Sequence, residues 1–312
     1  MKRVLIEELH QLSSQGWVVR WLMIGLLFGV GLIWGIVGNL PDRDLHLVVC
    51  DVGQGDAVLI HQGSMQVLVD GGPNSSVLDC LSRHLPFWDR TLEVVVLTHP
   101  QADHLNGLVD VLERYDVEQV VVNGLVNDTA GFRAFQEVVI DEGALVYLPS
   151  RGDEIRLGPI RLTVLLPEEK LGLARVWEEP GVTGEVLGIA THQGDLNETS
   201  VVLKLTFGKF DALLVGDIGF SSEQALIVDG VLSEVEVLKV GHHGSKYASS
   251  LDFLREIRPT LAVISVGGKN SYGHPTRDTL MRLDTVGARV FRTDVEGDIV
   301  IASDGEEYWV VD

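Results

Sequence analysis

The sequence contains 312 residues, carries a formal net charge of −21 at pH 7 and is 46% hydrophobic in composition. A chain of this length forms one large or two ordinary domains and can bury a full hydrophobic core. Because so acidic a surface repels nucleic acid over most of its area, the composition argues against a DNA-binding module. A phosphate substrate would need a bound metal and a local group of Lys or Arg residues to attract it.

The stretch from Trp21 to Leu40 is apolar except for Asn39 and contains no charged residue. About 20 apolar residues are enough to span a bilayer, so we expect an N-terminal segment over residues 1–20 and a transmembrane anchor over residues 21–40. The alternatives are a cleaved signal peptide, whose apolar core is usually shorter, and a buried helix.

Charges on either side of this stretch set its expected orientation. Lys2, Arg3 and Arg20 precede it, whereas only Arg43 follows it closely. Positively charged residues next to a membrane span stay preferentially in the cytoplasm. We therefore expect a single-pass protein of the cell membrane, with a cytoplasmic N-terminus and an extracytoplasmic C-terminal domain.

Residues 45–312 are expected to form one globular domain, because no low-complexity tract or second linker interrupts them. Three short apolar runs separated by Gly-containing turns open this domain and indicate antiparallel strands. The runs cover residues 45–50, 57–60 and 65–69. The turn at residues 51–56 combines Asp and Gly residues. A plain hairpin loop and a turn whose acids line a site both fit this composition.

The two cysteines lie in different predicted elements. Cys50 belongs to an apolar strand and Cys80 to a helix-like stretch, and neither stands in a CxxC or similar spacing. Such spacings are typical of metal-binding or redox cysteines. We interpret both residues as buried packing residues, and a disulfide between them remains the alternative.

Residues 98–107, Thr-His-Pro-Gln-Ala-Asp-His-Leu-Asn-Gly, directly follow the apolar run of residues 94–97. His99 stands at the end of a predicted strand, and Asp103 and His104 lie in the first turn of a predicted helix. One loop thus offers three ligands, and imidazole with carboxylate suits zinc, manganese or iron. The lack of cysteine argues against a closed structural zinc and indicates an open, water-bearing metal. The alternative is a chance His pair at a helix cap.

A weak internal duplication adds further ligands. One strand ending at Asp70 and another ending at His99 enclose a helical stretch, and the same order recurs with Asp217 and His242. Two similar β-α-β units place acid and imidazole groups at corresponding strand ends, where ligands collect in α/β sheets. We therefore expect Asp217 and His242 to complete a site for two metal ions.

Seven motifs, in this order, resemble the metallo-β-lactamase superfamily, and in particular the hydrolase domain of ComEC-type DNA-internalisation (natural competence) proteins. They are residues 51–56, 69–72, 98–107, 215–217, 238–246, 272–275 and 292–294. The resemblance implies an α/β fold of the αββα type, with two sheets packed face to face, helices outside and the metals at one edge. It does not extend to residues 1–41.

The resemblance also implies a set of metal ligands. His99 would bind the first metal, Asp103, His104 and His242 would bind the second, and Asp217 would bridge both ions. The cofactor would be a divalent metal, with one or two ions bound.

Departures from the superfamily pattern concern the first metal. Gln101 stands where the superfamily turn has its second His, and the third His has no clear match. Asn197 lies where ComEC-type proteins carry an Asn before a strand, and His192 is an alternative to it. Gln101, Asn197, His243 and Asp70 are therefore expected to be weak ligands or to lie behind the ligands. An oxygen-rich first site shifts the preference from Zn toward Mn or Mg.

The implied reaction is metal-assisted hydrolysis, in which a metal-bound hydroxide attacks phosphorus. Ser245 and Lys246 are expected to hold a phosphate group, and His274 to donate a proton to the leaving group or to contact the substrate. Asp217, Lys246 and His274 are the candidate catalytic residues. A solvated loop residue is the alternative for Lys246, and a plain turn residue is the alternative for His274.

Three functions remain open. The resemblance implies a membrane-anchored metal-dependent hydrolase that cleaves phosphodiester bonds, with single-stranded DNA as the substrate during DNA uptake. A hydrolase of a small phosphodiester or another ester is the first alternative, and a non-catalytic binding protein with a degenerate metal site is the second. The presence together of Asp103, His104, Asp217 and His242 argues against the second, because a decayed site has no need of that set.

Overall fold

The computed structural model describes residues 17, 19–31, 34, 43–171 and 194–311. The chain divides into two units, Met1–Asp42 and Arg43–Asp312. In the first unit, residues 19–31 are helical. No helix within the described residues is both long and apolar enough to cross a membrane. The expected anchor over residues 21–40 lies partly outside the described residues.

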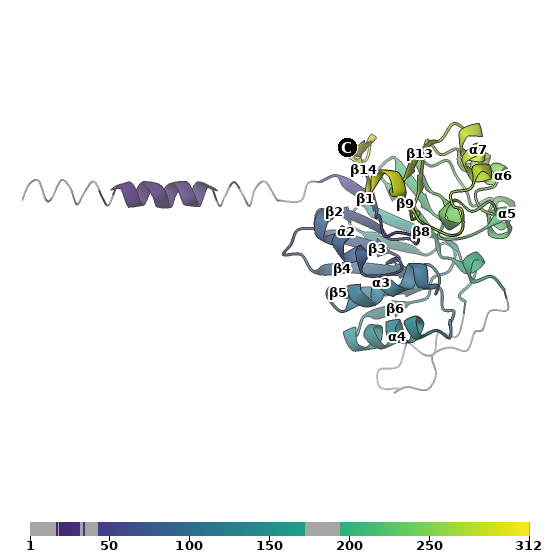
Figure 1. Cartoon of the computed structure of the whole chain (residues 1–312), viewed down its shortest axis with the longest axis horizontal. Helices are drawn as coiled ribbons and strands as arrows, with labels where there is room; N and C mark the ends of the chain where they lie inside the picture. Colours follow the sequence, from purple (N-terminus) through teal and green to yellow (C-terminus); the bar gives the residue numbers. More distant parts are fainter. Residues whose placement is uncertain (1–16, 18, 32–33, 35–42, 172–193, 312) are drawn as a thin grey trace, which may run out of the picture. The chain divides into compact units, whose positions relative to one another are not determined.

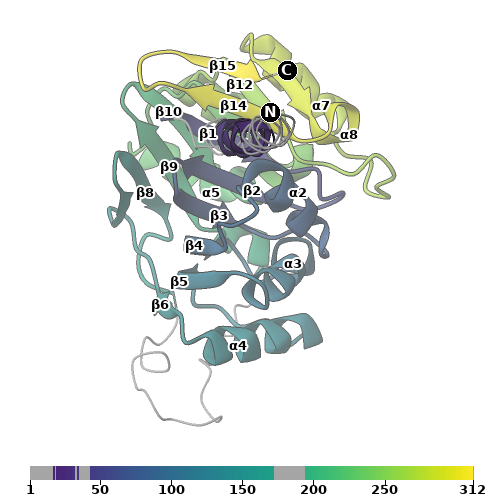
Figure 2. The ribbon, with the colours of Figure 1, turned by 90° about the vertical axis from the view of Figure 1, so that its left-hand side faces the viewer.

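The second unit is built on two β-sheets (Figure 1). In spatial order, the first sheet consists of β15 (Tyr308–Val311), β14 (Ile299–Ser303), β1 (Leu45–Val49), β2 (Val58–Gln62), β3 (Met65–Val69), β4 (Thr91–Leu97), β5 (Asp116–Val122) and β6 (Leu145–Tyr147). The second sheet consists of β13 (Arg289–Arg292), β12 (Leu261–Ile264), β11 (Val237–Lys239), β10 (Phe210–Leu214), β9 (Val202–Phe207), β8 (Ile160–Leu166) and β7 (Glu154–Leu157). Figure 2 shows β3, β4, β5 and β6 side by side in the first sheet.

Helices cover the outer face of each sheet, and the two groups lie apart in Figure 1. The first group is α2 (Ser76–His84), α3 (Ala102–Leu112) and α4 (Ala130–Glu142), and the second is α5 (Phe220–Val228), α6 (Leu251–Ile257) and α7 (Arg277–Thr285). A short helix, α8 (Thr293–Glu296), and two 3-10 turns, η2 (Leu196–Thr199) and η3 (Gly241–Gly244), complete the described elements. The expected αββα arrangement is therefore confirmed.

The fold has four layers, namely helices, sheet, sheet and helices, and a hydrophobic core lies between each layer and the next. Alternate side chains of a strand point to opposite faces of a sheet. In β4, Val94 and Val96 belong to the core between the two sheets, whereas Val95 and Leu97 belong to the core beneath α2, α3 and α4. A third core joins the second sheet to its helices and includes Leu213 and Leu238. Strands that are buried on both faces in this way form the interior of a sandwich.

Strand pairing bears out both patterns expected from the sequence. β1, β2 and β3 are antiparallel neighbours, as the opening runs predicted. β3 and β4 are parallel and joined through α2, and β10 and β11 are parallel and joined through α5. Parallel neighbours end at the same edge of a sheet. The two β-α-β units therefore bring the residues that follow β3, β4, β10 and β11 to one side of the sandwich.

Cys50 and Cys80 form a disulfide, with their Cα atoms 5.9 Å apart. Both residues are fully buried, because Cys50 follows β1 directly and Cys80 lies on the inward face of α2. Our interpretation of the pair as packing residues alone was wrong, and the alternative left open is the one the structure adopts. The bond ties the start of the turn at residues 51–56 to α2.

Candidate metal centre

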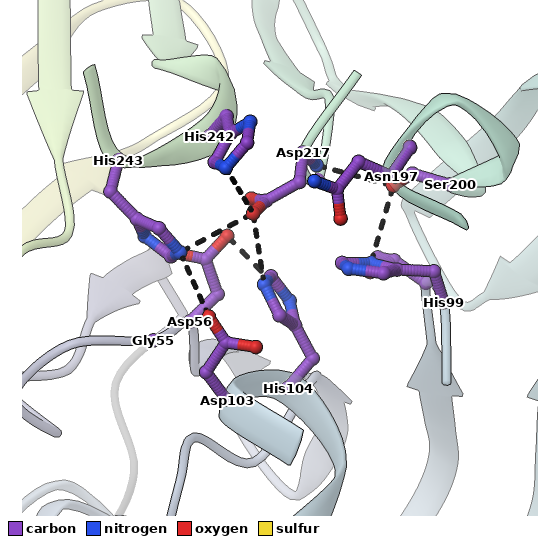
Figure 3. Close-up of polar contacts among 12 residues, drawn as sticks. Gly55, Asp56, His99, Asp103, His104, Asn197, Ser200, Asp217, His242 and His243 are labelled. Carbon is purple, nitrogen blue, oxygen red and sulfur yellow. Dashed lines mark hydrogen bonds and ion pairs between the residues drawn. The ribbon is translucent and has the colours of Figure 1, made fainter. Parts of the chain in front are cut away.

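Loops from both sheets meet at the edge where the parallel strands end (Figure 3). Asp70 directly follows β3, His99 follows β4 after one intervening residue, and Asp217 follows β10 after two intervening residues. His243 belongs to η3, which begins shortly after β11. Asp103 and His104 lie in the first turn of α3, as predicted, because this helix begins at Ala102 directly after the strand-end loop.

Four of these side chains form one group of ligand atoms. One atom each of Asp103, His104, Asp217 and His243 lie within 4.8 Å of one another. The Oδ2 atom of Asp217 is 3.4 Å from Nε2 of His104 and 3.3 Å from Nε2 of His243. The same Nε2 of His243 is 3.5 Å from Oδ2 of Asp103. Two imidazoles thus approach one carboxylate from different loops.

Three imidazoles share one pattern of hydrogen bonding. Nδ1 of His104 contacts Oδ2 of Asp70 at 2.7 Å, Nδ1 of His243 contacts the carbonyl oxygen of Ser265 at 3.0 Å, and Nδ1 of His99 contacts Oγ of Ser200 at 3.2 Å. The Nε2 atoms of all three rings are buried and have no hydrogen-bond partner among the described residues. A metal-bound histidine is held in the same way, through its other ring nitrogen.

Three oxygen atoms beside these rings are buried without hydrogen-bond partners in the described part of the chain, namely Oδ1 of Asp56, Oδ1 of Asn197 and Oδ1 of Asp217. Figure 3 shows the Asn197 amide between Asp217 and His99. Buried polar atoms without partners are uncommon, and each calls for an explanation such as an ion. Nitrogen and oxygen donors without a thiolate form a set that suits a divalent metal. The residues present therefore fit the metal that the sequence predicts.

The charges of the group also favour a cation. Burial alone would raise the pKa of Asp217, but the adjacent His243 and His104 hold that pKa well below its ordinary value. Burial lowers the pKa of His99 to about 3, and the neighbouring His104 adds to this effect. Asp217 is therefore ionised and His99 neutral at pH 7. Burial would lower the pKa of His104 and of His243, but Asp217 and the other nearby carboxylates raise it well above the ordinary value, so a metal that binds these two rings displaces a proton from each.

Asp56 and Lys239 form a buried ion pair beneath the group. Nζ of Lys239 also lies 3.9 Å from Oδ1 of Asp217, and Oδ1 of Asp56 lies 3.3 Å from Nδ1 of His243. Burial would raise the pKa of Asp56, but Lys239 and His243 lower it to about 2. The turn at residues 51–56 therefore supports the site, which was one of its two interpretations. The motifs of the sequence did not indicate Lys239 as a site residue, although a lysine within an apolar strand is an unusual feature.

The structure places His243 in the ligand group and His242, the ligand predicted from the sequence, beside it. His243 is 1% exposed and lies in the ligand group, whereas the side chain of His242 is 31% exposed with its Nε2 atom 3.9 Å from Oδ2 of Asp217. Both residues have positive φ angles, 47° for His242 and 53° for His243. This left-handed turn directs His243 inward and His242 to the rim, which no sequence pattern predicts.

The remaining candidates lie around the group. Gln101 precedes α3 as its N-terminal cap residue and is partly exposed, and His192 lies outside the described residues. Ser245 is buried, and its Oγ accepts a hydrogen bond from the backbone N–H of Tyr247 at 3.4 Å. Lys246 is exposed, with Nζ 4.8 Å from the centre of the Tyr247 ring. A phosphate contact by Ser245 or Lys246 stays a prediction.

His274 lies at the rim of the site. Its ring packs edge-on against that of His242 with a centroid separation of 5.6 Å, and its buried Nδ1 atom has no hydrogen-bond partner among the described residues. Burial, together with His242 and His243, lowers the pKa of His274 to about 4. Its position next to the ligand group is compatible with substrate contact, and its role as a proton donor stays a prediction.

The sandwich and its edge of histidines and carboxylates define a metal-dependent hydrolase of the metallo-β-lactamase type. A family model described as the metallo-beta-lactamase superfamily matches residues 50–268, so the chain belongs to this superfamily. The metallo-beta-lactamase fold protein YhfI from Bacillus subtilis has the same fold, with a TM-score of 0.55 and 14% identity over 84% of this chain and 100% of that one. Igni18, a metallo hydrolase from Ignicoccus hospitalis, gives a TM-score of 0.50 with 13% identity over 86% of this chain and 99% of that one.

Curated relatives include competence proteins, which confirms the resemblance to the ComEC type. ComE operon protein 3 of Bacillus subtilis is 28% identical over 269 residues, which cover 80% of this chain and 32% of the relative. Competence protein ComA of Neisseria gonorrhoeae is 29% identical over 262 residues, which cover 83% of this chain and 32% of the relative. The chain thus spans about a third of the length of these relatives.

Proposed function

We propose that this chain is a metal-dependent phosphodiesterase that cleaves DNA outside the cytoplasmic membrane during DNA uptake. The observation that carries the hydrolase part is that the Nε2 atoms of His99, His104 and His243 are buried without a hydrogen-bond partner among the described residues. Those of His104 and His243 lie beside Asp217. The names of the competence proteins support the substrate and its biological context.

Two adjacent groups of residues would hold the metal ions. His99 and Asn197 would serve one ion, while Asp103, His104 and His243 would serve the other, with Asp217 shared between them. Bound divalent ions supply a water molecule of lowered pKa and neutralise charge on the phosphate oxygens. Zinc and manganese both accept this mixture of nitrogen and oxygen donors, and magnesium becomes more acceptable where oxygen ligands dominate.

The residues of the chain hold this arrangement in place. Asp70 accepts a hydrogen bond from Nδ1 of His104, and the carbonyl oxygen of Ser265 accepts one from Nδ1 of His243, so both rings present Nε2 to the site. Asp56 and Lys239 fill the space behind Asp217 with a paired charge, and each of these three side chains is at most 3% exposed. The exposed side chains of the site are those of His242 and Asp103, at 31% and 32%.

Two features support a position outside the cytoplasmic membrane. The apolar stretch of residues 21–40, with more basic residues before it than after it, suits an anchor whose C-terminal domain is exported. The disulfide between Cys50 and Cys80 suits an oxidising compartment, because cytosolic thiols are normally kept reduced. Fractionation of cells that express the full chain, with protease treatment of intact spheroplasts, tests this part of the proposal. Full-length protein in the soluble fraction, or a domain protected from protease, contradicts it.

Hydrolysis is tested with the full chain in detergent, supplied separately with manganese, magnesium or zinc. The substrates are single-stranded DNA, duplex DNA and a chromogenic phosphodiester, and protein treated with a chelator is the matched control. We expect metal-dependent cleavage of DNA. Cleavage of the chromogenic compound alone would favour an enzyme for small phosphodiesters, and the absence of hydrolysis with every metal would overturn the proposal.

A further inference from the structure

A series of ring contacts connects the ligand group to the protein surface. The rings of His104 and His243 are 5.6 Å apart, those of His243 and His242 are 6.1 Å apart, and those of His242 and His274 are 5.6 Å apart. Tyr272 ends the series, with its ring stacked on that of His274 at 5.8 Å and an interplanar angle of 25°. The metal-binding side chains are therefore linked, ring by ring, to one exposed tyrosine.

Tyr272 is a large side chain left open to solvent. It is 70% exposed, although one face of its ring lies on His274. Aromatic side chains contribute to a core or an interface by burying a large area, and Tyr272 buries little of its area within this chain. One side of the aromatic ring is thus held against the rim of the site, and the rest is free to receive a second flat group.

Hydrogen bonds hold the loop of Tyr272 in place. The side chain of Asn270 donates to the carbonyl oxygens of Gly267 and His274, both at 2.8 Å, and its Oδ1 accepts from the N–H of His274 at 3.0 Å. The backbone N–H of Thr276 donates to the carbonyl oxygen of Gly244 at 2.9 Å, which joins the loop to η3. Tyr272 therefore has a defined position relative to His242 and His243.

The charge and shape of this rim suit a nucleotide. Lys246 and Lys269 are exposed on the two loops that carry His243 and Tyr272, in a chain whose net charge is −21. Positive side chains attract the phosphate backbone, while an exposed aromatic ring stacks on an unpaired base. Bases within a duplex are already stacked on their neighbours, so an aromatic platform of this kind selects single strands.

We propose that Tyr272 is a stacking platform for an unpaired nucleobase next to the phosphodiester that is cleaved. This proposal rests on the phosphodiesterase function proposed above and adds to it a residue that determines specificity. The stacked base places its own backbone phosphate toward His242 and the ligand group. Selection of single-stranded over duplex substrate follows from the base contact, because the ligand group contacts phosphate and not base.

The test compares substitutions at Tyr272 on substrates with and without bases. Tyr272→Ala removes the ring, and Tyr272→Phe keeps the ring without the hydroxyl group. Phe87→Ala is the matched control, because Phe87 is also an exposed aromatic residue, at 80%, but precedes β4 at the end of the strands opposite the site. The substrates are a single-stranded oligothymidylate and an abasic oligomer of the same length. Binding of a phosphorothioate oligothymidylate is measured in parallel by fluorescence anisotropy.

We expect Tyr272→Ala to raise KM and the dissociation constant for the oligothymidylate about tenfold with little change in kcat, since stacking of one base on one aromatic ring typically contributes this much. Tyr272→Phe should behave like the unmodified protein, as should Phe87→Ala. Neither Tyr272 variant should change hydrolysis of the abasic oligomer.

Equal effects of Tyr272→Ala on both substrates, or a defect of equal size in Tyr272→Phe, would overturn the stacking role. Unchanged binding of the phosphorothioate by Tyr272→Ala would do the same. If the unmodified protein hydrolyses neither oligomer with any metal, the proposed function fails, and the binding measurement still decides whether Tyr272 holds a base.

Discussion

The Nε2 atom of His243 lies 3.3 Å from Oδ2 of Asp217, although the two residues belong to loops that follow different strands, β11 and β10. Asp217 also lies 3.4 Å from Nε2 of His104, which comes from the first sheet's side of the sandwich. One carboxylate therefore joins imidazoles from both halves of the fold. Its position makes Asp217 the residue whose loss should affect the whole site.

Asp217→Asn should abolish hydrolysis and lower the metal content by more than one ion per chain. A shared carboxylate contributes to both ions and offsets their mutual repulsion, which a neutral amide does not do. Metal content of the purified protein, measured by mass spectrometry, checks this expectation. Asp211→Asn is the control, because Asp211 lies on β10, the strand that precedes Asp217, but pairs with Lys204 at 2.8 Å. Retention of both metals or of activity by Asp217→Asn would contradict the assignment.

His243→Ala and His242→Ala should differ in their effects on metal binding. We expect His243→Ala to weaken binding at least about 100-fold, because a direct ligand matters at least as much as the groups that orient ligands. His242→Ala should leave metal affinity nearly unchanged, since His242 lies at the rim. Competition with a fluorescent chelator measures both affinities. If His242→Ala weakened metal binding more than His243→Ala, the ligand would be His242, as the sequence predicted.

Removal of one member of the Asp56–Lys239 pair should destabilise the protein strongly. Both side chains are nearly fully buried, at 3% and 2% exposed. Breaking such a pair leaves an unpaired buried charge and costs about 3–5 kcal/mol in the free energy of unfolding. We expect this loss for Asp56→Ala and for Lys239→Met, measured by urea unfolding of chelator-treated protein.

The double variant should lose less than the sum of the two single losses, because neither charge then remains unpaired. Additive losses would show that the two residues do not act as a pair. Lys209→Met serves as the control, since Lys209 pairs with Glu306 at an exposed position and should contribute little or nothing.

The disulfide should contribute to stability as well as to the position of the turn at residues 51–56. It closes a loop with a sequence separation of 30 residues between Cys50 and Cys80. Cross-links of this kind typically stabilise a protein by about 2–4 kcal/mol. Cys80→Ser should lower the free energy of unfolding by this amount, whereas a reductant should have no further effect on the variant. If Cys50 of the unmodified protein can be alkylated after unfolding without a reductant, the disulfide is absent.

Asp298 should make part of the stability depend on pH in the acid range. Burial would raise the pKa of Asp298, but His84, the backbone N–H of Asp51 and Arg83 together lower it from 3.8 to about 2. A carboxyl group with a lowered pKa in the folded state stabilises the protein above its unfolded pKa, and this contribution is lost as pH falls. Unfolding free energy should therefore decline between about pH 4 and pH 2, and the decline should be smaller in Asp298→Asn. Identical profiles for the two proteins would contradict this expectation.

Much of the site could be predicted because its parts are close along the chain. His99, Asp103 and His104 lie within six consecutive residues, so any fold that ends a strand just before His99 and begins a helix at Ala102 brings them together. The alternation of apolar and polar stretches predicted the two β-α-β units, and parallel strands necessarily end at one edge. That repetition alone predicted Asp217 as a site residue.

Only the tertiary structure decided which neighbouring side chains face the site. The choice between His242 and His243 depends on two positive φ angles in η3. The pairing of Asp56 with Lys239 joins residues 183 positions apart, and Nδ1 of His104 finds Asp70 across 34 positions. Cys50 and Cys80 meet because α2 packs over the end of β1. Sequence patterns specify which residues lie on a strand or helix, but the direction of a side chain in a loop follows from backbone angles and from packing between distant elements, and these exist only in the folded chain.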